Sequence, residues 1–171
     1  GRPVGFLAVR VVEASDLDWP GGVPARRLNP YVVVRCADRQ EVTSVKTRTA
    51  KPRWDQTFVM EVLDEKEDLI QVLVMCGQGE LGTWTFGVRE VVVDFEGHMQ
   101  GWVQLCPPSW CFSDVSEGRI RLSIKYQAVA PPQEAEEARL PDGLASSPLV
   151  DEVDPAALLF RAPSVPLRTD S

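Results

Sequence analysis

The sequence has 171 residues, and 44% of them are hydrophobic, which is enough for one ordinary core. No apolar run approaches the roughly 18 to 20 residues that are needed to cross a bilayer as a helix, so the sequence predicts no membrane-spanning segment. The formal charge of -7 is uneven, because residues 1–127 carry a net -2 and residues 128–171 a net -5. A nearly balanced front part argues against a general nucleic-acid binder, since such domains are usually strongly basic.

Short segments of alternating apolar and polar residues, separated by turn residues, follow one another along the first three quarters of the chain. The clearest is Arg119–Tyr126, where apolar residues recur at every second position. The expected strands are Leu7–Val12, Tyr31–Cys36, Glu41–Thr47, Trp54–Val62, Leu69–Cys76, Phe86–Val92, Trp102–Leu105 and Ile120–Tyr126. The pattern predicts an all-β fold, an eight-stranded antiparallel β-sandwich.

After Gln127 the composition changes to proline, acidic and small residues, which cannot bury a core. We therefore expect one domain over 1–127 and a flexible, acidic, proline-rich tail or linker over 128–171. One apolar island interrupts the tail at Asp154–Arg161. It is read as plain tail, as the start of a further element, or as a motif that docks a partner through Leu158, Leu159 and Phe160.

The chain carries four cysteines and one histidine, in a spacing that makes no zinc site: Cys36, Cys76, Cys106, Cys111 and His98. We expect unpaired thiols, with a disulfide between Cys106 and Cys111 as the alternative. Around His98, in Glu96-Gly97-His98-Met99, the local sequence suggests no Cys-His or Ser-His-Asp arrangement, and no glycine-rich phosphate loop is present. The sequence therefore predicts neither an enzyme nor a cofactor or metal site.

Five segments, in order, resemble motifs of the C2 domain family. They are Leu7–Leu17 for its opening strand, Asn29–Val34 for Ser-Asp-Pro-Tyr-Val, Val45–Thr49 for its Lys-Thr-Lys strand, Pro52–Phe58 for Asn-Pro-x-Trp-Asn-Glu-x-Phe, and Val72–Met75 with Phe86-Gly87 for its later strand and Ile-Gly step. The resemblance implies a C2-type sandwich. Because the strand at Gly118–Tyr126 comes last, it implies the circular variant called type II topology.

Family members typically hold calcium with two carboxylates from the first loop and three from the third, since calcium takes six to eight oxygen ligands. The resemblance places Val23 and Asn29 at the two first-loop positions, and Cys76, Gln78 and Trp84 at the third-loop positions. The nearby acids that remain are Asp16, Asp18 and Glu80, and Arg26 and Arg27 add positive charge. We therefore expect a calcium-independent domain.

The same alignment suggests what stands in place of calcium. Trp19, Val23, Leu81 and Trp84 are expected at loop tips, where they contact a membrane or a partner or else brace the loops. Lys46 and Arg48 stand two apart on an expected strand, and with Arg35, Lys51 and Arg53 they form a candidate lipid-binding set or an ordinary solvated face.

The functional expectation is a cytoplasmic, peripheral module that docks a larger protein onto anionic phospholipid without calcium. The alternative is a protein-interaction or scaffolding domain that binds no lipid. A third reading is a calcium-dependent membrane sensor.

Overall fold

The structure is a computed structural model that describes residues 2–19, 24–108, 111 and 116–130. The chain divides into two units, Gly1–Val129 and Ala130–Ser171. The expectations about the tail, including partner docking by Leu158, Leu159 and Phe160, lie outside the described residues.

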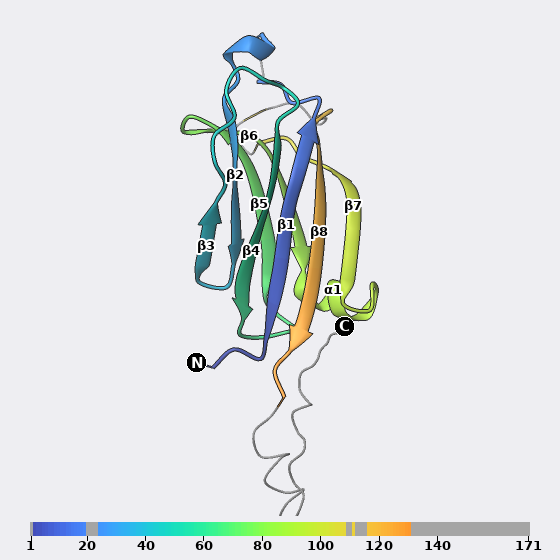
Figure 1. Ribbon diagram of the computed structural model, residues 1–171. Helices are drawn as coiled ribbons and strands as arrows, with labels where there is room; N and C mark the ends of the chain where they lie inside the picture. The colour runs from blue at the N-terminus through green and yellow to red at the C-terminus, as the bar shows by residue number, and fades with distance from the viewer. Residues whose placement is uncertain (1, 20–23, 109–110, 112–115, 131–171) are drawn as a thin grey trace, which may run out of the picture. The chain divides into compact units, whose positions relative to one another are not determined.

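The described part of the first unit is an eight-stranded β-sandwich, as the sequence predicts (Figure 1). Its elements are β1 (Gly5–Ser15), η1 (Ala25–Arg27), β2 (Pro30–Cys36), β3 (Arg39–Val42), β4 (Arg53–Val62), β5 (Leu69–Cys76), β6 (Gly79–Gly87), α1 (Val88–Val93), β7 (His98–Gln104) and β8 (Arg119–Ala128). One antiparallel sheet has the order β4-β1-β8-β7, and the other has the order β3-β2-β5-β6.

The core lies between the two sheets because every second side chain of the central strands points inward. In β1, Leu7, Val9 and Val11 are fully buried, and Val9 and Val11 lie opposite Ile124 and Leu122 of β8. The second sheet contributes equally buried residues, namely Val32, Val34, Ile70, Val72 and Val74. Burial of these aliphatic side chains is the main free-energy gain that holds the two sheets together.

The strand expected over Glu41–Thr47 is wrong in its bounds, because β3 ends at Val42. The chain then follows the edge of β2 irregularly: the backbone N–H groups of Thr43, Lys46 and Thr49 donate to the carbonyls of Val32, Pro30 and Leu28. Successive donors are three residues apart in 43–49, whereas successive acceptors are two residues apart in 28–32. One extra residue per step is the spacing of repeated β-bulges. Lys46 and Arg48 consequently do not lie on a regular strand, and strand alternation does not put them on one face.

The strand expected over Phe86–Val92 is also wrong, because β6 ends at Gly87 and residues 88–93 form the helix α1. The valine run favours a strand, but Val88 and Val91 are spaced by three residues and both are fully buried. That spacing puts them on one helical face, which packs against the core where the chain crosses from one sheet to the other. Tertiary packing outweighs the β propensity of valine here.

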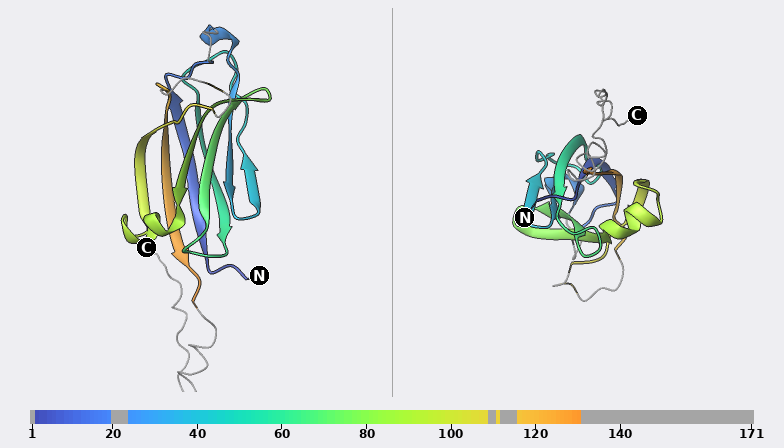
Figure 2. Two further views of the ribbon diagram at one scale, coloured as in Figure 1. Left: turned by 180° about the vertical axis from the view of Figure 1, so that it is seen from behind. Right: turned by 90° about the horizontal axis from the view of Figure 1, so that it is seen from below.

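Both open sides of the sandwich are bridged. On one side, Ser44, which lies next to the β3 edge, makes two hydrogen bonds with side chains of β4. Its backbone N–H donates to Gln56 Oε1 at 2.8 Å, and its carbonyl accepts from Trp54 Nε1 at 2.9 Å. On the other side, Thr83 and Cys106 exchange two backbone hydrogen bonds at 2.7 and 3.0 Å. α1 lies at the end of this second side, where it connects β6 to β7 (Figure 2).

Candidate functional site: a cationic loop end

The described parts of four connections lie at one end of the sandwich, and we call them the loop end: residues 16–19 and 24–29, 43–52, 77–78, and 105–108 with 111 and 116–118 (Figure 1). Their described cations are Arg26, Arg27, Lys46, Arg48 and Lys51, and their described carboxylates are Asp16, Asp18 and Glu117. The connections at the opposite end, residues 37–38, 63–68 and 88–97, carry two cations and eight carboxylates. Charge is therefore polarised along the strands, with the positive side at the loop end.

The five cations of the loop end make no ion pair with any described residue. Arg26 and Arg27 lie in η1 and are exposed, as are Arg48 and Lys51, whereas Lys46 is half-buried. Cations without a carboxylate partner keep their hydrogen-bond donors for water or an added anion. This end can therefore bind anionic groups without first breaking an ion pair.

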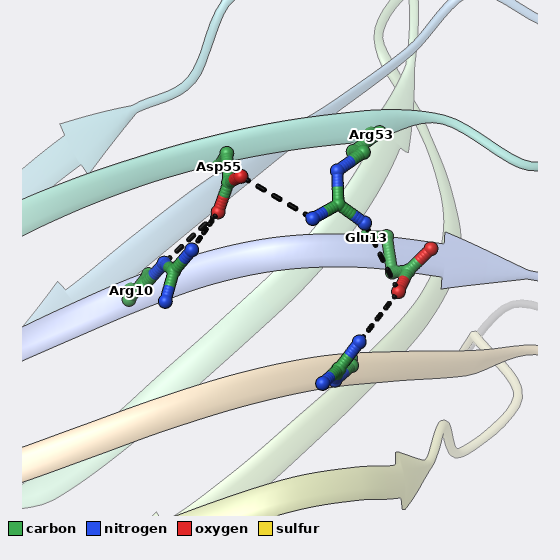
Figure 3. A network of polar contacts seen from close by, with 5 residues as sticks. Arg10, Glu13, Arg53 and Asp55 are labelled. Carbon is green, nitrogen blue, oxygen red and sulfur yellow. Dashed lines mark hydrogen bonds and ion pairs between the residues drawn. The ribbon is translucent and has the colours of Figure 1, made fainter.

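The arginines on the outer face of the sheet β4-β1-β8-β7 behave differently (Figure 3). Asp55 accepts two hydrogen bonds from Arg10, at 2.5 and 2.9 Å, and a further one from Arg53 at 3.3 Å. Glu13 lies 3.3 Å from Arg53 and 3.0 Å from Arg121. Shared carboxylates thus join the guanidiniums of neighbouring arginines. We call this network of Arg10, Asp55, Arg53, Glu13 and Arg121 the arginine ladder.

The ladder also has an electrostatic signature. Its arginines lower the pKa of Asp55, first through the hydrogen bond from Arg10 and then through the charges of Arg10 and Arg53. A lowered carboxyl pKa means that the ionised form is stabilised in the folded protein. The ladder is therefore a self-compensating network on the surface of the sheet.

The structure separates the five residues predicted to bind lipid. Lys46, Arg48 and Lys51 lie together in the connection between β3 and β4, at the loop end. Arg53 belongs to the ladder and is paired with Glu13 and Asp55. Arg35 lies five residues along β2 from Pro30, about 16 Å at the usual rise per residue, and its Nε donates to Gln40 Oε1 at 2.8 Å. The five do not form one surface.

The predicted loop-tip residues are also separated. Leu81 and Trp84 lie in β6, so their expected position in a loop is wrong: Leu81 is 3% exposed, and Trp84 lies opposite Val72 and packs against the core. Trp19 is half-buried, and a Cβ atom on Gly79 would collide with its ring, so Trp19 lies on the backbone of β6. Val23 lies outside the described residues.

Val45 is a loop-end residue that the sequence reasoning missed. It lies next to Lys46 and is 53% exposed, although it is a large aliphatic residue. An expected strand over Glu41–Thr47 hides its exposure, because valine is common in strands. In the irregular segment, Val45 instead adds an apolar contact beside the cations.

The positions that carry calcium ligands in the resemblance make contacts within the protein. Asn29 Oδ1 accepts a hydrogen bond from the N–H of Arg48 at 2.9 Å, and the N–H of Asn29 donates to Cys76 Sγ at 3.4 Å. Gly77 takes a φ of +61°, and its carbonyl accepts a 2.6 Å bond from Tyr31 Oη, which fixes the two-residue turn at 77–78. The segment to which the resemblance assigns the third-loop positions is thus a tight turn at 77–78, and β6 follows from Gly79.

Two carboxylates remain near these positions in the first connection. Asp16 pairs with Arg119 at 3.3 Å, and Arg119 in turn lies 4.9 Å from the centre of the Trp102 ring. Asp18 is exposed. Within the described ranges, no three histidine, cysteine or acidic residues come close enough together to hold a metal ion.

His98 and the cysteines are the other titratable groups that the sequence singled out. His98, at the start of β7, has a lowered pKa because burial and then the charge of Lys125 disfavour its protonation. Cys36, Cys76 and Cys106 are free thiols, so the alternative of a disulfide at Cys106 is wrong. Burial raises the pKa of Cys36 to about 11. Cys36 therefore stays a neutral thiol packed in the core.

The arrangement is a two-sheet β-sandwich with a cationic loop end. A model of the C2 domain family matches residues 5–105, which is more than half of the chain. This chain belongs to the C2 domain family. None of the helices among the described residues is long and apolar enough to cross a membrane.

Known proteins of similar sequence or structure are consistent with this family. Multiple C2 domain and transmembrane region protein 9 from Arabidopsis thaliana is 35% identical over 69 residues, which are 40% of this chain and 7% of that protein. A structure of Extended-Synaptotagmin 2 that contains its SMP domain and two C2 domains gives a TM-score of 0.65 at 17% identity, over 76% of this chain and 29% of that one. A single C2 domain of a plant Extended Synaptotagmin 1 gives 0.61 at 22% identity, over 77% of this chain and 100% of that one.

The two structural likenesses concern the fold alone, since both identities are below 25%. The chain spans only a small part of the curated relative and less than a third of the first of these structures. C2 domains generally act as modules that bind membranes or lipids.

Proposed function

We propose that this chain is a calcium-independent, peripheral recruitment module whose loop end docks a larger protein onto anionic membrane lipid. The observation that carries the proposal is the contrast in ion pairing. Five loop-end cations have no described carboxylate partner, whereas Arg10, Arg53, Arg119 and Arg121 on the neighbouring sheet face all have one. The proposal assigns the chain a binding role and no catalytic step.

Lipid headgroups suit the loop end because the cations come from two connections that lie at one end of the sandwich. Each basic residue near an anionic leaflet contributes about 1 kcal/mol. Arg26, Arg27, Lys46, Arg48 and Lys51 would together give a strong, salt-sensitive attraction. Val45, which is 53% exposed beside Lys46, would add apolar contact with the lipid interface.

Polarity along the strands favours one orientation at the membrane. The opposite end carries eight carboxylates in its described connections, and an anionic leaflet repels them. The domain would therefore approach with its loop end first. Electrostatic steering of this kind raises the association rate and weakens as salt is added.

Calcium independence is supported by what occupies the ligand positions. Asn29 uses its side-chain oxygen to hold the N–H of Arg48, and Cys76 accepts the N–H of Asn29. Trp84 lies within β6 rather than in a loop. Five cations at the same end that have no carboxylate partner among the described residues would also repel a divalent cation. The first strand, β1, pairs with β4 and β8 and not with the second strand, β2, which supports the type II connectivity as part of the same proposal.

The test is co-sedimentation with vesicles of phosphatidylcholine containing a rising fraction of phosphatidylserine, in the presence of a calcium chelator. We expect binding that increases with the anionic fraction. The variant Lys46→Ala/Arg48→Ala/Lys51→Ala should lose at least about tenfold in affinity, as removal of three cations near the leaflet predicts. The matched control is Lys66→Ala/Arg89→Ala/Lys125→Ala, which removes the same charge from exposed positions away from the loop end.

Equal losses in the two triple variants would show that only net charge matters and would refute docking by the loop end. No binding at any lipid composition would favour the protein-interaction reading instead. Calcium is tested separately by the melting temperature: a rise in millimolar calcium would mean that the folded state binds the ion, and calcium independence would then be wrong.

A further inference from the structure

The end of the sandwich opposite the loop end presents an apolar surface that the proposed function does not use. Val93, the last residue of α1, is 62% exposed, and Phe95, in the turn that follows, is 43% exposed. The buried face of α1 is formed by Val88 and Val91, so packing of the helix does not need Val93 at this position. We call Val93 and Phe95 the α1 pad.

The pad is held on a firm base. The Phe95 ring lies edge-on to Phe86, with centroids 5.9 Å apart, and Phe86 stacks on Trp84 at 5.1 Å with an interplanar angle of 11°. Phe86 and Trp84 pack against the core. A partly exposed aromatic ring whose other side is fixed loses little conformational entropy on binding, which is a property of residues that dominate interfaces.

Carboxylates outnumber cations around the pad, where Arg89, one turn before Val93, is the cation on α1. Asp94 and Glu96 flank Phe95 in the sequence and are both exposed, and neither makes an ion pair with a described residue. Glu90 lies one turn earlier, with its carboxylate against Gly87. The carbonyl of Asp68 accepts the N–H of Val88, so the acidic connection 63–68 adjoins the start of α1.

We propose that the α1 pad is a docking surface for a polypeptide segment that carries a bulky apolar side chain flanked by lysine or arginine. The apolar side chain would cover Val93 and Phe95, and the flanking cations would meet the carboxylates of Asp94 and Glu96. An anionic membrane is disfavoured as the occupant because these carboxylates repel it. The surface is distinct from the loop end, so the two contacts can be made at the same time (Figure 1).

The test uses the full chain, isotope-labelled for NMR, and two synthetic peptides. One peptide alternates lysine with leucine and phenylalanine, and the other has the same charge with glycine in place of each apolar residue. We expect the first peptide to shift the amide signals of residues 88–98 and the second to bind at least about tenfold more weakly, since apolar burial supplies much of the affinity.

Three variants locate the surface. Val93→Ser should weaken binding of the first peptide about fivefold, by loss of apolar contact. Asp94→Asn/Glu96→Gln should weaken it to a similar extent at low salt and much less at high salt. Val59→Ser is the matched control, because Val59 is 67% exposed on β4, and it should bind like the unchanged chain.

Three outcomes would overturn the proposal. The first is peptide-induced shifts confined to residues 130–171 or to the loop end, and the second is equal affinity of Val93→Ser and the unchanged chain. The third is perturbation of the signals of Val93 and Phe95 by vesicles containing phosphatidylserine, which would make lipid the occupant. Because the peptide test contains no lipid, its failure leaves the vesicle result for the loop end unaffected.

Discussion

The loop end and the outer face of the sheet β4-β1-β8-β7 both carry several basic residues, but in the part of the chain that the structure describes only the sheet face supplies each arginine with a carboxylate. Along the ladder, Glu13 is shared by Arg53 and Arg121, and Asp55 by Arg10 and Arg53. At the loop end, the backbone is irregular, and no described carboxylate pairs with Arg26, Arg27, Lys46, Arg48 or Lys51. Regular cross-strand register brings opposite charges together, whereas a bulged edge leaves its cations without partners.

This difference teaches that a count of basic residues is a poor guide to anion binding. A paired guanidinium must give up a carboxylate before it binds a phosphate, so part of the new interaction is offset by the lost one. An unpaired guanidinium or ammonium exchanges only water. The three predictions below use variants that interchange these two situations.

The largest effect is expected from charge reversal at the two sites. Lys46→Glu/Arg48→Glu should lower vesicle affinity at least about thirtyfold, corresponding to a loss of about 2 kcal/mol, and should leave the melting temperature nearly unchanged. Arg10→Glu/Arg121→Glu makes the same change in net charge. It should keep most of the vesicle affinity but lower the melting temperature by about 3–6 °C, because each new carboxylate faces Asp55 or Glu13.

The reversal experiment is measured by co-sedimentation and by thermal unfolding of the same preparations. If the two double variants lose the same vesicle affinity and have the same melting temperature, the pairing of a cation does not affect its contribution to vesicle binding.

A smaller effect is expected when a paired site is made to resemble an unpaired one. Glu13→Gln frees one side of Arg53 and of Arg121 without changing the side chain's shape. Vesicle affinity should rise about two- to fivefold, in the range expected for one or two additional basic contacts after partial screening. Glu67→Gln removes the same charge from an exposed residue that has no described ion-pair partner, and serves as the control. An equal rise in the control would attribute the gain to net charge alone.

The smallest effect concerns acid stability of the ladder. Because the folded-state pKa of Asp55 is lowered, its ion pairs stabilise the fold above the ordinary aspartate pKa and cease to do so as the pH falls through the folded value. Asp55→Asn should therefore melt about 1 °C lower than the unchanged chain near neutral pH, and the difference should disappear in strong acid. Thermal unfolding from strong acid to neutral pH measures it. A difference that grows toward low pH would have the wrong sign for a lowered pKa.

Much of the fold could be predicted because most strands show a local alternation of apolar and polar residues. The inward residues Leu122 and Ile124 of β8 repeat every second position, and so do Leu7 and Val9 of β1. This alternation is local, so it predicts those strands whichever strands they pair with. The two elements that failed depend on packing between distant segments.

The helix α1 illustrates this limit. Val91-Val92-Val93 reads as a strand, and only the need to bridge two sheets, with Val88 and Val91 buried on one side, makes a helix the better solution. The third-loop expectation failed for a related reason. Trp84 and Phe86 alternate with threonines, which is a strand signal, but the assignment of Trp84 to a third-loop position concealed it.

The candidate site was half predictable. Lys46, Arg48 and Lys51 are close in the sequence, so their proximity at one end could be expected. Arg53 follows them just as closely, yet its partner Glu13 comes from another strand, and no local pattern shows that pairing. The exposure of Val45 depends likewise on where β3 ends.

The bonds from Trp54 and Gln56 to Ser44 have a consequence for how this domain behaves when crowded with copies of itself. An exposed edge strand can form backbone hydrogen bonds with a strand of another molecule, and such pairing is the first step in the formation of many aggregates. At Ser44 both the amide and the carbonyl are already engaged by side chains from the facing sheet. Extension of an intermolecular β-sheet past Ser44 would have to break these two hydrogen bonds first. The bonds therefore disfavour self-association of the domain through this edge.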